Sequence, residues 1–202
     1  MKLRLLLTAL AAGLLVSCAA DGPYHPDSRP ERLEFHDARL KIYPEDVRKD
    51  PALYDKLRVA WAGIIVTNKV SEDNSGDKLR IDTVFESRYF DWMQHGDGWG
   101  HRLLISPRGE GLFRMRWNLK RKDPQATFED AMKYAAPGKL AIVYGTPESV
   151  DEDGTIVLHY HYLRIFDKAH FSADALDYGR QGEEPVRPVH VTPKPATNSP
   201  SR

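Results

Sequence analysis

The chain has one cysteine, no excess of either charge, and no apolar run that reaches the roughly 20 residues of a membrane-spanning helix. Cys18 is the single cysteine among 202 residues, so no intrachain disulfide can form and stability must come from packing. Lysine and arginine together number 29, as do aspartate and glutamate. This balance provides no general basic field, and we expect no nucleic-acid partner.

The N-terminal segment combines a basic start, a short apolar run and the lone cysteine. Lys2 and Arg4 precede residues 5–16, which are apolar apart from Thr8. The run is too short to span a bilayer, but its length and charged start are typical of a secretory signal peptide. The sequence therefore predicts that residues 1–17 are a signal peptide that is removed from the mature protein.

Cys18 ends this segment within a short motif. The stretch Leu15-Val16-Ser17-Cys18 resembles the bacterial lipobox, whose cysteine receives a diacylglycerol and, after cleavage, an acyl chain such as palmitate on its amino group. A reactive thiol is not favoured, because no neighbouring histidine or arginine would activate it. An ordinary signal peptide with an incidental cysteine is the alternative. Two or three acyl chains suffice for stable attachment, so we expect Cys18 to be the lipid attachment site of a membrane anchor.

The residue after the cysteine bears on location. In Gram-negative lipoproteins an aspartate there usually means retention at the inner membrane, and this chain has Ala19. For a Gram-negative source, the resemblance implies a lipid-anchored protein on the periplasmic face of the outer membrane. Its expected partners are the membrane, through the N-terminal lipid, and an envelope protein, glycan or lipid ligand.

Proline-rich segments flank the body of the chain. Residues 18–34 contain three prolines, several charges and few apolar residues, which predicts a flexible tether. Residues 177–202 contain five prolines and almost no large apolar side chain. Such a segment cannot offset its ordering entropy, so we expect a disordered tail. Residues 35–176 are then expected to form one domain.

The body has the alternation of β-strands. Apolar and polar residues alternate over 79–88, and 57–68 is apolar on both faces, as in a strand buried on two sides. Turn residues at 74–77 join these two runs into a predicted hairpin. The remaining expected elements are helical turns at 44–46 and 50–54, a strand at 102–117 that is bent or split near Pro107, a helix that begins near Thr127 and ends before Pro137, and strands at 139–145 and 155–166.

This order, with one helix between the third and fourth strands, matches the OB-fold, a five-stranded Greek-key barrel. Barrel closure would remove the exposed edges that so many apolar strands otherwise present. A small antiparallel sandwich is the alternative. We predict a mainly β, OB-like barrel.

Residues 14–166 are similar to the Slp-type outer-membrane lipoproteins. The resemblance rests on residues 15–18, on 51–54 leading into 59–63, and on 140–145 before the final strand. The segment 90–101 and the proline-rich tail depart from the family. The resemblance implies a role in starvation or envelope stress, without an established catalytic activity.

Residues 90–101 form the most unusual stretch, with Trp92 and Trp99 among several glycines. Two interpretations are open. The tryptophans could form a mobile aromatic lip that binds a glycan, peptide or lipid, or they could cap the barrel as part of its structure.

A basic stretch begins at Arg114 and Arg116, surrounds Trp117 and continues to Lys122. Basic and aromatic residues together on an OB-fold are typical of single-strand nucleic-acid binding, but an anchored envelope protein meets little nucleic acid. Contact with anionic headgroups and a merely solvated strand face are the other interpretations. Our candidate ligand-binding residues are Trp92, Trp99, Arg114, Arg116 and Trp117.

His159 and His161 alternate with Tyr160 on a predicted strand, so their imidazoles should lie on one side, about 7 Å apart. Zinc normally takes three or four ligands, and His95 and His101 could supply more. The alternative is a pair bonded to water or to the backbone. We expect no metal and no cofactor, and keep His159 and His161 as an alternative metal site.

Catalytic motifs are absent from the sequence. There is no GxSxG elbow, no HExxH pair and no phosphate-binding loop. The sequence therefore predicts a non-catalytic binding or scaffolding module of the cell envelope. A periplasmic metal-binding or hydrolytic protein that uses the histidines is the alternative.

Overall fold

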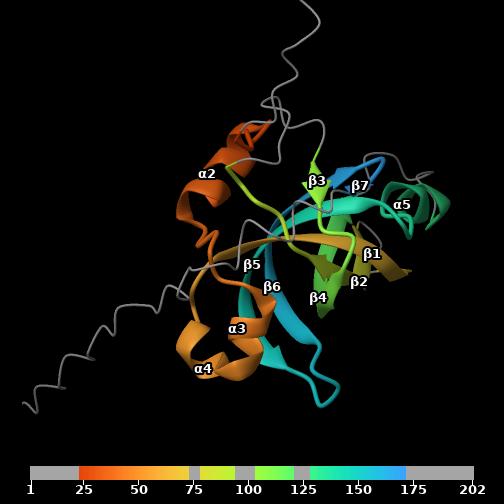
Figure 1. The fold of residues 1–202 in the computed structure, drawn as a ribbon. Helices are drawn as coiled ribbons and strands as arrows, with labels where there is room; N and C mark the ends of the chain where they lie inside the picture. Colours follow the sequence, from red (N-terminus) through yellow and green to blue (C-terminus); the bar gives the residue numbers. More distant parts are fainter. Residues whose placement is uncertain (1–22, 73–77, 94–102, 121–127, 172–202) are drawn as a thin grey trace, which may run out of the picture.

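The computed structural model of the chain describes residues 23–72, 78–93, 103–120 and 128–171 (Figure 1). The elements are α2 (Arg29–Asp37), α3 (Pro44–Lys49), α4 (Pro51–Tyr54), β1 (Val59–Glu72), β2 (Lys78–Arg88), β3 (Leu104–Ile105), β4 (Gly109–Lys120), α5 (Phe128–Tyr134), β5 (Leu140–Val150), β6 (Ile156–Phe166) and β7 (His170–Phe171). Several predictions fall outside the described residues: the signal peptide 1–17, Cys18, Ala19, the turn at 74–77, His95, Trp99, His101, Lys122 and the tail 177–202.

The five long strands form one closed ring. Their order is β1-β2-β4-β6-β5, and β5 pairs with β1 to complete the ring. Neighbouring strands are antiparallel except β4 and β6, which run parallel. The predictions of a mainly β fold and of the β1–β2 hairpin pairing are confirmed.

The two faces of the sheet are filled by two separate cores, which explains the sequence pattern. On β2 every second residue is buried, because only one face of that strand is covered. On β1, Val59 and Trp61 belong to the core inside the ring, whereas Ala60 and Ala62 belong to the core on its outer face. The continuous apolar run that begins β1 therefore reflects burial on both sides, as predicted.

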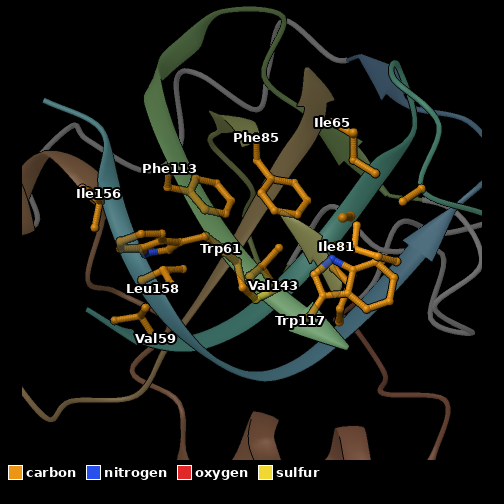
Figure 2. Packing of buried hydrophobic residues seen from close by; sticks show 14 of the residues in the cluster. Val59, Trp61, Ile65, Ile81, Phe85, Phe113, Trp117, Val143, Ile156 and Leu158 are labelled. Carbon is orange, nitrogen blue, oxygen red and sulfur yellow. The ribbon is translucent and has the colours of Figure 1, made fainter. Parts of the chain in front are cut away.

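The inner core is almost entirely apolar and rich in aromatic rings (Figure 2). Phe85 and Phe113 stack with their ring centroids 4.9 Å apart, and Trp61 meets Phe113 edge-on at 5.4 Å. Gly63 lies beneath them, and a Cβ there would stand 2.9 Å from the Phe113 ring. Burial of each such side chain contributes about 1.5–3 kcal/mol. These aromatic side chains therefore supply much of the stability of the closed sheet.

The segment before β1 corrects the expectation of a flexible tether over 18–34 for residues 24–34, which lie in the described part of the chain. From Tyr24 onward this segment packs on the outer face of the ring, and Tyr24 and Glu31 are buried. Ser28 caps α2 by accepting the backbone N–H of Glu31 at 3.2 Å. The prolines that suggested a tether include Pro30 in the first turn of α2, a position where proline favours a helix.

The two predicted helical turns before β1 are confirmed as α3 and α4, which lie together at one end of the ring (Figure 1). Arg48 on α3 donates to the carbonyl oxygens of Glu110 at 2.5 Å and Gly154 at 3.2 Å. The indole of Trp61 donates to the carbonyl oxygen of Ile42 at 2.7 Å. These bonds fix the helical segment to β1, β4 and the β5–β6 turn.

Two strands differ from their predicted lengths. The region 102–117 divides into β3 and β4 around Pro107, and β3 pairs in parallel with β7, which was not predicted. β5 continues to Val150, past the predicted end at 145. Pro147 does not end β5, because the β5–β6 register shifts next to it and accommodates the missing N–H.

Among the residues that the structure describes, no helix has the length and hydropathy needed to cross a membrane.

Candidate functional site

A groove of about 590 Å³ crosses β2, β4, β6 and β5. It opens where two parallel strands separate: β4 and β6 pair only from Phe113 to Met115 on β4 and from Ile156 to Leu158 on β6. The polar and aromatic residues that line it are Arg80, Asp82, Arg114, Arg116, Trp117, Asn118, Glu148, Ser149, His159 and Tyr160. The structure thus brings the predicted Arg114, Arg116 and Trp117 together with His159.

The three arginines of the groove differ in how they are paired. Arg116 lies opposite Asp82 in the β2–β4 register, and its guanidinium is 3.4 Å from that carboxylate. Arg114 pairs with Asp151 at 3.1 Å. The guanidinium of Arg80 has no hydrogen bond or ion pair to any part of the chain that the structure describes. Arg80 is therefore the groove arginine that is open to an anionic group.

Trp117 borders the groove but belongs to the inner core. Its side chain is only 5% exposed, and its Nε1 donates to Thr83 Oγ1 at 3.0 Å. Tyr134 of α5 meets its indole edge-on, with ring centroids 6.1 Å apart. The residue was predicted as a ligand contact, and the structure places it as a buried wall of the groove.

His159 and His161 lie on the same side of β6, as predicted. Their ring centroids are 5.5 Å apart, which is closer than the spacing expected of a regular strand. His159 Nδ1 is 3.2 Å from Glu148 Oε1, and His161 Nε2 is 2.9 Å from Thr146 Oγ1. Within the described residues, no group of three His, Cys, Asp or Glu side chains could hold a metal ion.

His161 occupies the boundary between β6 and α2. Its Nδ1 is 3.7 Å from Glu34 of α2, which in turn pairs with Arg58 at 3.3 Å. Burial lowers the pKa of His161, and the charge of Arg58 lowers it further, while Glu34 acts in the opposite direction. The neutral imidazole is therefore the form that fits this contact.

At Trp92 the structure supports a structural role and not a mobile aromatic lip. Its side chain is 7% exposed and packs in the outer core against Tyr24, Phe35 and Phe90, with ring centroids 4.8–5.7 Å apart. The backbone of Tyr24 donates to the Trp92 carbonyl oxygen at 2.8 Å. Trp92 therefore offers no open aromatic face.

Beneath α2 lies a buried polar cluster that the sequence did not predict. Glu31 is fully buried and accepts hydrogen bonds from Tyr24 Oη, from Tyr144 Oη at 3.2 Å and from Arg164 Nη1 at 3.3 Å. The two phenols bind Glu31 Oε1, and the backbone N–H of Asp27 donates at 2.9 Å to Oε2, the oxygen that Arg164 also binds. These partners come from the N-terminal segment, β5 and β6, so the cluster joins α2 to the ring.

Burial and the neighbouring carboxylate raise the pKa values of Tyr24 and Tyr144 well above that of a free phenol. Both phenols therefore stay neutral and remain hydrogen-bond donors to Glu31. With Arg164 as its cation, the buried carboxylate is fully partnered, as a buried charge requires. A signal was available in principle, since Glu31 follows the N-cap Ser28 by three residues, as in a capping box.

Comparisons with known proteins found no family model that matches the chain and no curated protein significantly similar to it.

Proposed function

We propose that the protein is a lipoprotein that is anchored through Cys18 to the periplasmic face of the outer membrane. The main support for this proposal is the position of the only cysteine, which follows an apolar run and lies within the lipobox-like stretch 15–18. Residues 1–17 would be removed, and Ala19 would direct sorting away from the inner membrane. The acylated cysteine would attach the chain with no need of a transmembrane helix.

For the folded body we propose the OB-fold. Counted in chain order, the long strands follow the sequence first, second, third, fifth, fourth around the ring. The third and fifth run parallel, and α5 lies between the third and the fourth. This arrangement supports an OB-like Greek key, and it agrees with the resemblance to the Slp-type lipoproteins.

The body would act as a non-catalytic binding or scaffolding module, with the groove as its binding site. The unpaired guanidinium of Arg80 and the aromatic side chain of Tyr160 together suit an envelope ligand that carries a carboxylate or phosphate on a flat or apolar framework. Such a ligand fits a role in envelope maintenance under stress or starvation.

Mass spectrometry of the native N-terminal peptide tests the anchor. The expected peptide begins at Cys18 and carries a diacylglycerol and an amide-linked acyl chain. A mature protein that begins at Met1, or one whose Cys18 is unmodified, would contradict the proposal.

NMR of the indole N–H groups tests the groove. On addition of peptidoglycan fragments or anionic phospholipid, the signal of Trp117 should shift, because its indole borders the groove. Trp61 is an internal control, because it does not line the groove and its indole donates to the carbonyl oxygen of Ile42. The variant Arg80→Gln should weaken the response, and Lys168→Gln, which also removes one exposed cation, should not. If the chemical shift of the Trp117 indole N–H changes with none of these ligands, the binding function is contradicted and only the scaffolding function remains.

A second candidate function rests on the contact between the His159 and His161 rings. A periplasmic metal-binding or hydrolytic protein would use this pair together with further ligands. Elemental analysis of the purified mature protein should then find zinc or copper in stoichiometric amount, and the double variant His159→Ala/His161→Ala should lose it. A wild-type protein without stoichiometric metal would exclude this function.

A further inference from the structure

The outward face of α2 carries a stripe of basic side chains around one apolar residue. Arg29, Arg32, Leu33 and His36 follow the i, i+3, i+4, i+7 spacing of a single helix face, and all four are exposed. Leu33 is 62% exposed. The opposite face, with Glu31 and Phe35, packs against the ring.

The acidic residues of α2 do not neutralise this stripe. Glu31 is buried with Arg164, while Glu34 and Asp37 pair with Arg58 at 3.3 and 2.7 Å. Arg29 and Arg32 have no ion pair within the part of the chain that the structure describes. The stripe therefore presents uncompensated positive charge to the surroundings.

The stripe lies close to the point where the folded body meets the membrane linker. Tyr24 is fixed to the body through Trp92 and Glu31, and it comes six positions after Cys18, with five residues between them. Six extended residues reach at most about 22 Å, and α2 itself is about 14 Å long. An acylated Cys18 would therefore hold α2 within a short distance of the bilayer surface.

Two exposed apolar side chains belong to the segments that pack around Tyr24. Met93 and Leu33, at 67% and 62%, are the most exposed large hydrophobic side chains among the described residues. Met93 directly follows Trp92, whose carbonyl oxygen accepts the backbone N–H of Tyr24. Leu33 is on the outward face of α2, and Phe35 on the opposite face of the same helix packs on Tyr24 at 5.6 Å. Basic residues around exposed apolar ones are the composition of a surface that binds a membrane interface.

We propose that the outward face of α2, together with Met93, is a membrane-docking surface that binds anionic phospholipid headgroups. The arginines would contact headgroup phosphates, and Leu33 and Met93 would enter the interface. This inference rests on the lipid anchor proposed above, and it fixes which side of the ring faces the bilayer. Helix α5, whose Ala131 and Ala135 belong to the inner core and which lies apart from α2 in Figure 1, would then not be part of this surface.

The test uses the acylated full-length protein in vesicles of phosphatidylcholine, with and without phosphatidylglycerol. Once Cys18 is acylated, an introduced cysteine is the only free thiol. A polarity-sensitive fluorophore is attached at Leu33→Cys on α2 or, as the control, at Met132→Cys on α5, where the native side chain is 40% exposed. With anionic vesicles, the label at position 33 should shift to the blue and be quenched by spin-labelled headgroups, whereas the label at 132 should do neither.

Charge variants extend the test. Removal of each arginine by Arg29→Gln or Arg32→Gln should weaken docking about fivefold on anionic vesicles, and have little effect on neutral ones. Lys133→Gln, on α5, should leave docking unchanged. Thermal unfolding of each variant establishes that the fold is intact.

Two failures can be told apart by mass spectrometry of the same preparation. If Cys18 carries no acyl chain, the anchor and the docking surface are both overturned. If Cys18 is acylated and the labels at 33 and 132 respond alike, the docking surface is overturned and the anchor stands.

Discussion

The two faces of the closed sheet exclude water in different ways. The inner face is filled by apolar and aromatic side chains that need only the right volume. The outer face beneath α2 also buries a carboxylate, Glu31, with Arg164 and two phenols as its partners. An apolar core loses stability in proportion to the volume removed, whereas a buried ion pair fails when either partner is lost. The two faces should therefore respond differently to substitution.

The largest loss is expected in the inner core. Phe113→Ala removes a fully buried ring that contacts both Phe85 and Trp61, and should lower the free energy of unfolding by about 3–5 kcal/mol. Phe113→Leu should lose clearly less, because it leaves a smaller cavity. Urea unfolding followed by tryptophan fluorescence measures both. Equal losses for the two variants would mean that cavity volume does not determine the loss of stability in the inner core.

On the outer face, Arg164→Met should cost about 2–3 kcal/mol, because it leaves Glu31 buried without its cation. The loss should be local: hydrogen exchange should rise over residues 24–37 before it rises in β1 and β2. The double variant Glu31→Leu/Arg164→Met removes both charges and should recover part of the stability. If the double variant is less stable than Arg164→Met alone, the cation is not the main partner of Glu31.

The difference between the inner and outer faces of the sheet also explains which features could be predicted from the sequence. The strands were predictable because alternation and apolar runs are local patterns, as in β2 and in the apolar start of β1. The packing of residues 24–37 on the ring was not predictable, because it depends on Tyr144 and Arg164, which lie more than 100 residues further along the chain. In the groove, Arg114, Arg116 and Trp117 were found from the sequence.

The groove residues that the sequence did not suggest come from other strands. Arg80 and Asp82 carry no motif, and only the β2–β4 register brings them beside Arg116. The sequence left the binding and the structural interpretation of Trp92 open, because Tyr24, which helps to bury it, belongs to a segment that was expected to be a tether.

A smaller effect is expected where Arg48 joins α3 to β4. Gly111 has a φ of +94°, and a Cβ there would meet the guanidinium of Arg48. Gly111→Ala should therefore cost about 1–3 kcal/mol, from backbone strain and from displacement of that side chain. Gly138→Ala is the matched control, because its φ is +86° and a Cβ there would meet nothing within 4 Å. Thermal unfolding that shows equal losses would mean that Arg48 moves aside freely.

The smallest expected effect is a pH dependence of stability that arises at the contact between His161 of β6 and Glu34 of α2. Because burial and Arg58 lower the pKa of His161 in the folded state below its ordinary value of 6.5, the unfolded chain binds this proton first as the pH falls. The contribution of His161 to the free energy of unfolding is therefore unchanged above pH 6.5. It becomes increasingly unfavourable as the pH falls from there through the folded-state pKa.

Urea unfolding at pH 7.5 and at pH 5.5 measures the contribution of His161 to the free energy of unfolding. The contribution is obtained as a difference between variants, because the other histidines contribute equally to each variant. His161→Gln should lose less stability between the two pH values than the wild type. Glu34→Gln should lose more, because Glu34 is the group that favours the charged imidazole and its removal leaves Arg58 opposed to it. If His161→Gln keeps the full wild-type pH dependence, the α2 contact is no more sensitive to protons than the apolar interior of the ring.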